Sequence, residues 1–288
     1  MPENIQSRIF RIGDFSFRVL SPEALNCPEN FLLFKSSDDT YSYTYEISIC
    51  DVLPSPEYKP VTTRDDIRIL KKDNHEERLL IARGDDTPYA IYREISDDRA
   101  IIRIKRNKQE LFSLDTVFNS VFALERHLID YDALLLHCAY IEINDTAVLF
   151  SAPSGVGKST QASLWEQYKK ANIINGDRAL IQRSDQGFMV HGFPVCGSSE
   201  ICHARSLPIK AIVMLSQAKS NHLSHISLIA SFTSLYGQIT INSWDRGFTE
   251  KSVDILNCLA EKVPIYKLDC TISQEAVDIL YSELFLRG

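Results

Sequence analysis

Alternation of apolar and polar residues dominates the N-terminal third of the chain. The clearest case is 41–50, where tyrosine and isoleucine alternate with serine, threonine and glutamate. This period of two is typical of a β-strand with one solvated face. Two apolar segments, 9–12 and 15–20, flank a Gly-Asp pair that favours a hairpin turn. Shorter apolar segments at 79–82 and 100–104 predict further strands, so we expect a strand-rich region, and it contains no motif that carries chemistry.

The period of the apolar positions changes near residue 113. From Ser113 onward, apolar side chains recur at the spacing of one helix face, which predicts a helix with Ser113 as its N-cap. Because a different alternation of elements follows, we place a domain boundary just before this helix. The predicted domains are a strand-rich domain, residues 1–110, expected to help recognise a substrate or partner, and a second domain, residues 111–288.

Strands and helices are mixed in the second domain. Buried strands are predicted at 134–141 and 147–150, joined by an Asn-Asp turn. A helix is predicted over 158–170, with Trp165 and Tyr168 as packing residues. Further strands are predicted at 173–174, 179–181, 188–190, 211–215 and 263–268, and further helices at 225–237, 248–262 and 273–286. The predicted fold class is therefore α/β, of the mixed α+β kind.

Composition narrows the class of protein only broadly. The 288 residues are 44% hydrophobic and 24% charged, as in ordinary globular proteins. A net charge of −7 argues against a general nucleic-acid binder, which is usually basic. No apolar run approaches the roughly 20 residues of a membrane-spanning helix, and the N-terminus lacks the pattern of a secretory signal. The 7 cysteines are scattered without a C-x-x-C pair. We therefore expect a cytoplasmic protein that binds neither nucleic acid nor membrane.

The segment 151–160, Ser-Ala-Pro-Ser-Gly-Val-Gly-Lys-Ser-Thr, carries the main chemical signal. It differs from the phosphate-loop pattern G-x-x-x-x-G-K-[ST] only in having Ala152 at the first glycine. Gly155 and Gly157 allow the backbone to turn its N–H groups toward phosphate oxygens. The predicted helix directs its positive N-terminus at the same anion, which favours a phosphate site over a simple glycine turn. The expected nucleotide-binding residues are Ser154, Gly155, Val156, Gly157, Lys158, Ser159 and Thr160.

A phosphate loop also needs groups that act on the outer phosphates and the metal. Lys158 supplies a mobile positive charge, and the Ser159 hydroxyl can ligate Mg²⁺. Asp177 follows a short predicted strand in the sequence Asn-Gly-Asp. This sequence is also good turn chemistry, but the helix that leads from the loop into that strand favours a site. We expect Ser159 and Asp177 to be metal ligands, and Lys158 and Asp177 to be catalytic.

His137 interrupts an otherwise apolar predicted strand. One interpretation is a core histidine with a satisfied hydrogen bond. If 134–141 pairs with 147–151 in an antiparallel hairpin, however, His137 lies at the end from which the phosphate loop emerges. The residues alone leave both interpretations open, and His137 is a catalytic candidate.

Together these motifs, continued by Gly-Phe-Pro-Val-Cys-Gly at 192–197, resemble the C-terminal domain of HPr kinase/phosphorylase and its HPr-kinase-like relatives. That family has a P-loop kinase fold related to phosphoenolpyruvate carboxykinase. The resemblance implies that His137 lies at the active site, that Lys158 and Ser159 bind phosphates and Mg²⁺, and that Asp177 activates an acceptor hydroxyl. It thereby implies a kinase that transfers the γ-phosphoryl group of ATP, or of another NTP, to a serine of a peptide or protein or to a small molecule.

Two positions depart from the family pattern. Arg178 replaces a second aspartate, and Thr160 replaces an acidic residue. The loop that contacts HPr in that family is not recognisable around 191–205, so HPr itself is not the expected acceptor. Arg178 and Arg205 are candidate clamps for phosphate or an acidic substrate, with structural ion pairs as the alternative. A nucleotide-binding regulatory module without transfer and a simple NTPase also stay open, as does the oligomeric state.

Overall fold

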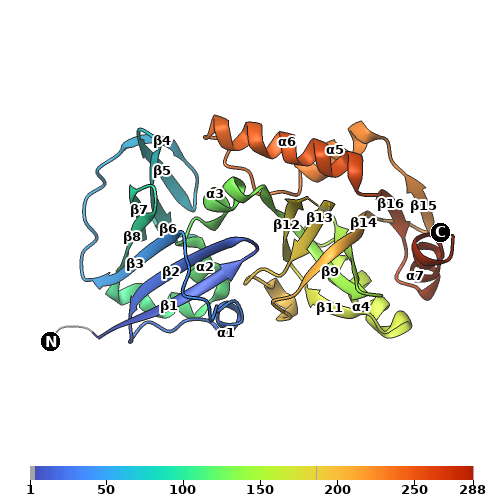
Figure 1. Cartoon of the computed structure of the whole chain (residues 1–288), viewed down its shortest axis with the longest axis horizontal. Coiled ribbons are helices and arrows are strands. Elements are labelled where there is room, and N and C mark those ends of the chain that lie inside the picture. The colour runs from blue at the N-terminus through green and yellow to red at the C-terminus, as the bar shows by residue number, and fades with distance from the viewer. Residues whose placement is uncertain (1–3, 186, 288) are drawn as a thin grey trace. The chain divides into compact units, whose positions relative to one another are not determined.

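The computed structural model describes residues 4–185 and 187–287. The chain divides into two compact units, Met1–His127 and Leu128–Gly288, and within the described residues each contains a mixed sheet of eight strands (Figure 1). The α/β class predicted from the sequence is therefore confirmed. Across 4–185 and 187–287, no helix combines the length and apolar character needed to cross a membrane.

The sheet of the first unit has the strand order β1-β2-β3-β8-β7-β6-β5-β4. Its elements are β1 (Ile5–Ile12), β2 (Phe15–Pro22), α1 (Glu29–Leu32), β3 (Tyr43–Cys50), β4 (Lys59–Thr63), β5 (Ile67–Lys72), β6 (His75–Ile81), β7 (Pro88–Ser96) and β8 (Arg99–Lys105). The predicted hairpin is present, because β1 and β2 pair antiparallel and Gly13 in the turn has a φ of +58°. The other strands predicted in this region correspond to β3, β6 and β8.

Aromatic rings form much of the core of the first unit. Phe17 packs edge-on against Tyr45, with ring centroids 5.4 Å apart. Phe122 lies 5.0 Å from Tyr45 and 5.3 Å from Phe31, between centroids. Because Phe122 belongs to the segment that follows residue 110, this segment packs into the first unit. The division after His127 therefore differs from the boundary expected after residue 110.

The helix predicted from Ser113 is divided into short pieces, and the predicted N-cap is wrong. The predicted segment forms α2 (Asp115–Ser120) and α3 (Leu124–Leu128), and a 3₁₀ helix η1 (Arg106–Ser113) precedes them. The Ser113 hydroxyl donates to the carbonyl of Glu110 at 2.8 Å, and Leu114 occupies the N-cap of α2. The interruption coincides with Ala123, which has a φ of +51°. The spacing of apolar residues correctly predicted helical backbone in this segment. It did not predict the turn at Ala123, which divides the helix into two.

The elements of the second unit agree with nearly every segment predicted for it. The strands are β9 (Ala133–Ile143), β10 (Thr146–Ser151), β11 (Asn172–Asn175), β12 (Arg178–Ser184), β13 (Gly187–His191), β14 (Ser206–Gln217), β15 (His222–His225) and β16 (Ile265–Cys270). The helical elements are η2 (Ile129–Tyr131), α4 (Lys158–Lys169), η3 (Gly197–Ser199), α5 (Leu228–Tyr236), α6 (Arg246–Lys262), α7 (Gln274–Tyr281) and the π-helical turn η4 (Ser282–Leu286). β15 was not predicted, and Tyr168 is 37% exposed rather than packed.

Two long strands each take part in two portions of the second sheet. The first half of β9 pairs with β12, and its second half pairs with β10. The first residues of β14 pair with β13, and later ones pair in parallel with β10 and β16. Because β10 is bonded to both β9 and β14, the path β10-β9-β12-β13-β14 closes on itself.

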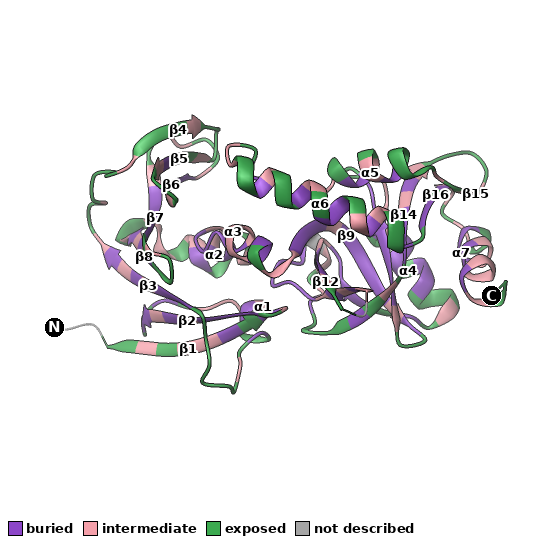
Figure 2. Ribbon diagram, turned by 45° about the horizontal axis from the view of Figure 1, so that its top comes forward, coloured by how far each residue is buried: buried purple, intermediate pink, exposed green. Residues whose placement is uncertain are grey.

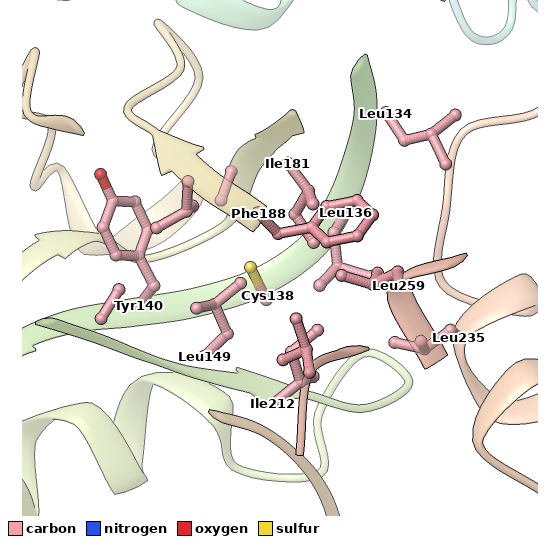
Figure 3. Close-up of a cluster of buried hydrophobic side chains, with 14 of the residues drawn as sticks. Leu134, Leu136, Cys138, Tyr140, Leu149, Ile181, Phe188, Ile212, Leu235 and Leu259 are labelled. Carbon is pink, nitrogen blue, oxygen red and sulfur yellow. The ribbon is translucent and has the colours of Figure 1, made fainter. Parts of the chain in front are cut away.

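Alternate residues of β9 point into two different hydrophobic clusters. Leu136 and Cys138 lie in the cluster that Figure 3 shows together with Leu235 of α5 and Leu259 of α6. Odd-numbered residues such as Ala139 pack in a second cluster, together with side chains from α4 and α7. Figure 2 shows β9 buried along most of its length. Its two half-buried positions are His137 and Glu142, so His137 lies on the odd-numbered face, beyond the end of the second cluster.

Candidate phosphate-binding site

The phosphate-loop segment connects β10 to α4, which is the strand–loop–helix context expected from the sequence. Gly155 and Gly157 have φ values of +80° and +121°, which side-chain-bearing residues rarely adopt, so both positions require glycine. The Gly157 carbonyl accepts the backbone N–H of Gln161 at 2.9 Å and starts the helix. Exposure is high at Ser154, Gly155 and Ser159 and intermediate at Val156, Gly157 and Thr160, which leaves this surface open to a ligand.

Lys158 is the buried cation of this segment, with only 8% of its surface exposed. Its Nζ donates to the carbonyl oxygens of Ala152 at 3.0 Å and Pro153 at 3.4 Å. Burial lowers the pKa of the ammonium group below its ordinary value, and the charge of Asp177 opposes this shift. Since the two bonded oxygens are neutral, the lysine can exchange them for an anion at little electrostatic cost.

The loop and Asp177 meet at consecutive residues of β9. Ser151, the last residue of β10, is paired with Cys138, and Arg178, the first residue of β12, is paired with His137. The Ser151 hydroxyl donates to the His137 carbonyl at 2.8 Å. The Cys138 N–H donates to the Asp177 carbonyl at 3.0 Å. The antiparallel pairing expected of the two strands is thus present, and it brings His137 to the end from which the loop emerges.

The side chains of His137, Asp177 and Arg178 form one charged group. His137 Nε2 lies 3.6 Å from Asp177 Oδ1, and Arg178 Nε donates to the other carboxylate oxygen at 3.3 Å. Burial and then the charge of Lys158 lower the pKa of His137, while Asp177 acts in the opposite direction. Arg178 also donates to the Thr240 hydroxyl at 3.4 Å. The net effect disfavours the charged imidazolium of His137, whose ring lies beside the Asp177 carboxylate.

The two expected metal ligands, Ser159 and Asp177, are both linked to Gly176: Ser159 by a hydrogen bond and Asp177 as the next residue of the chain. The Ser159 hydroxyl donates weakly to the Gly176 carbonyl at 3.5 Å, and the Asp177 side chain is 28% exposed. Hydroxyl and carboxylate oxygens are hard donors, and Mg²⁺ typically uses one or two protein carboxylates together with substrate phosphates and water. These residues therefore fit a magnesium ion bound with a nucleotide. In the part of the chain that the structure describes, no three His, Cys, Asp or Glu residues converge on a metal site made by protein alone.

Two residues that touch the site were given no role from the sequence. Gln217, at the end of β14, donates to the carbonyls of Gly155 and Val156 at 3.4 and 3.3 Å. Asn175, at the end of β11, is fully buried and bonded to the backbone on both of its sides. A polar residue that ends a buried strand is the sequence signal that could have identified Asn175. Gln217 carries no comparable signal.

Arg205 does not belong to this charged group. Its Nη2 and Nε lie 2.5 and 3.1 Å from Oε1 of Glu142, and half of its side chain is exposed. This is the ion pair that was the alternative to a phosphate clamp. The interactions of Arg178 remain compatible with both of its predicted roles.

The fold and the site define a mixed α/β protein in which a strand, a glycine loop and a helix bring a buried lysine close to a His–Asp pair. Residues 100–278 match the family described as SynChlorMet cassette protein ScmC. This match spans more than half of the chain, and the protein belongs to the ScmC family.

The chain was also compared with solved structures and with curated proteins. The Hpr(Ser) kinase/phosphatase from Coxiella burnetii is similar over 54% of this chain and 99% of its own, with 9% identity and a TM-score of 0.30. No curated protein matches the chain significantly.

Proposed function

We propose that the protein is an HPr-kinase-like phosphotransferase that moves the γ-phosphoryl group of ATP, with Mg²⁺, to a hydroxyl of a peptide, protein or small molecule. The observation that carries this proposal is the position of two charges. Lys158 lies at the junction of the glycine loop and α4, and Asp177 directly precedes β12, which pairs with β9. Phosphate binding and proton acceptance are thereby within one site.

Each group has a distinct task in the proposed transfer. Backbone N–H groups around Gly155 and Gly157, together with Lys158, hold the phosphates. Magnesium, bound by Ser159 and Asp177, supplies charge neutralisation at the transferred phosphoryl group. Asp177 also orients the acceptor hydroxyl and accepts its proton. Most of the acceleration then comes from positioning and from stabilising negative charge, as is usual for phosphoryl transfer.

The two basic neighbours of Asp177 act on the acceptor side. The neutral His137 imidazole can accept or donate a hydrogen bond without competing for the phosphates. The Arg178 guanidinium is positioned by Asp177 and Thr240, and 41% of its side chain remains exposed. Arg178 can thus bind a transferred phosphoryl group or an acidic group of the acceptor.

The test uses γ-labelled ATP, Mg²⁺ and an extract of cells that produce the protein. Wild type is compared with Lys158→Ala and Asp177→Asn, and the matched controls are the exposed Lys219→Ala and Asp145→Asn. We expect label on an acceptor with wild type and both controls, and none with the two site variants. Nucleotide binding without turnover would instead identify a regulatory module. Free phosphate without a labelled acceptor would identify an NTPase.

A further inference from the structure

The side chain of Asn175 joins the turn that carries Asp177 to the segment 193–195. It is fully buried, with 0% of its surface exposed. Its Nδ2 donates to the carbonyls of Phe193 at 2.8 Å and Val195 at 3.1 Å. Its Oδ1 accepts the backbone N–H groups of Asp177 and Arg178, both at 2.9 Å. Only a carboxamide offers two donors and an acceptor with two lone pairs, so aspartate and leucine, though similar in size, cannot make these four bonds.

The turn around Gly176 is packed closely against the segment 193–199. A Cβ on Gly176 would come 2.0 Å from Ser199 Oγ and 2.4 Å from Ser199 Cβ. Gly197 has a φ of +59°, and a Cβ there would lie 3.0 Å from the Cβ of Asp177. The segment 193–199 therefore forms a close wall against the Asp177 turn. This wall and the turn are joined through the Asn175 amide.

The backbone of Asp177 is held on both sides of its Cα. Its N–H is bonded to Asn175, and its carbonyl accepts the N–H of Cys138 on β9 at 3.0 Å. The Gly176 carbonyl accepts the hydroxyl of Ser159 from the start of α4. The backbone that carries the carboxylate is thus hydrogen-bonded to β9, to the start of α4 and, through the buried side chain of Asn175, to the wall segment.

We propose that Asn175 is the positioning residue for Asp177, and that it fixes the carboxylate relative to the phosphate loop and to the wall segment 193–199. This role rests on the proposed phosphoryl transfer, in which Asp177 acts on the acceptor. A misplacement of about 1 Å at a reacting group can cost about 100-fold in rate. Loss of the amide therefore slows transfer. The glycine loop takes part in none of these four bonds, so it keeps its own affinity for the nucleotide phosphates.

The test compares the full chain with Asn175→Ala and with Asn172→Ala, a control on the same strand at an exposed position. Affinity for ATP is measured by titration with a fluorescent ATP analogue, with and without Mg²⁺ for wild type. The variants are compared without Mg²⁺, because Asp177 is itself a proposed metal ligand. Turnover in the presence of Mg²⁺ is measured by release or transfer of labelled phosphate. We expect Asn175→Ala to lower turnover by about 100-fold with affinity changed less than about twofold. Asn172→Ala should match wild type in both measurements.

A second measurement, amide hydrogen exchange without nucleotide, needs no substitution. In wild type the N–H groups of Asp177 and Arg178 should exchange as slowly as those in the paired part of β12, because the buried Oδ1 of Asn175 accepts both. Fast exchange at these two amides overturns the proposal even if Asn175→Ala fails to fold.

The outcomes separate this role from the proposed function. A wild type that does not bind Mg²⁺–ATP overturns the phosphotransferase proposal. A wild type that binds and turns over ATP, beside an Asn175→Ala variant of equal turnover, overturns only the role of Asn175. A folded Asn175→Ala variant that loses affinity and turnover in parallel also overturns it, because the residue would then support the whole site rather than Asp177.

Discussion

His137 Nε2 lies 3.6 Å from Asp177 Oδ1, yet the carboxylate does not make this histidine more basic than an exposed one. Burial withdraws the ring from water, and the charges of Lys158 and Arg178 further disfavour the imidazolium. Asp177 and a hydrogen bond with Gln238 only partly offset these effects. The net effect favours the neutral form of the imidazole beside the Asp177 carboxylate.

Removing the carboxylate charge should make His137 even less basic. In Asp177→Asn the attraction for the imidazolium is lost, while burial and Lys158 remain, so the pKa of His137 should fall further. NMR titration of the ring proton checks this, with the signal assigned through a His137→Gln variant. Asp145→Asn removes the same charge at the turn between β9 and β10 and should leave the titration unchanged. A pKa that rises or stays constant in Asp177→Asn contradicts the geometry.

Nucleotide should stabilise the protein only when Lys158 is present. A ligand at 100 times its dissociation constant stabilises the folded state by about 2.7 kcal/mol, which raises the midpoint of thermal unfolding. We expect this rise with Mg²⁺–ATP for wild type and for Lys219→Met, but not for Lys158→Met, which keeps the buried hydrocarbon stem. An equal rise in all three proteins would place the nucleotide elsewhere.

A methyl group on Gly176 should destabilise the site through one neighbour. The added Cβ would overlap both side-chain atoms of Ser199, and overpacking of this kind costs about 1–3 kcal/mol. The double variant Gly176→Ala/Ser199→Gly should recover most of that loss, as measured by urea unfolding. Gly237→Ala is the control, because its Cβ would meet nothing closer than 3.8 Å. If the double variant is no more stable than Gly176→Ala, the close contact is not the cause.

Phe122→Ala tests where the first unit ends. The ring packs among aromatic residues of that unit, and removing a buried phenylalanine side chain costs about 3–5 kcal/mol. The midpoint temperature for unfolding of the first unit should therefore fall. The midpoint temperature of the transition that Mg²⁺–ATP raises should stay unchanged. If the substitution instead lowers the nucleotide-sensitive transition, residues 111–127 belong with the second domain, as the sequence suggested.

The local parts of the fold were predictable because their signals are contiguous. The glycine loop, α4 and the hairpin of β9 and β10 each follow from a short stretch of sequence. Asp177 was found by the same means, since it follows the first strand after that helix. The proximity of His137 to the loop needed only one assumption, that neighbouring strands pair antiparallel.

The remaining parts depend on contacts between distant residues. Nothing in the sequence indicated that β9 changes partners along its length, or that Phe122 packs against Tyr45. The four bonds of Asn175 were hidden for the same reason, because two of its partners lie in a loop far along the chain. Buried charge pairs, such as Arg93 with Glu77 in the first unit, likewise follow no periodic pattern.

The closed path of strands has a consequence for how this site can change. The loop strand and the Asp177 strand are registered on adjacent residues of β9, so their separation is set by the repeat of a single backbone, about 3.3 Å per residue. A one-residue insertion between His137 and Cys138 would shift one register against the other and reverse which face each later side chain occupies. Variation can therefore occur in the loops around the site, whereas the spacing between the glycine loop and the Asp177 carboxylate is set by β9 and changes only if β9 itself changes.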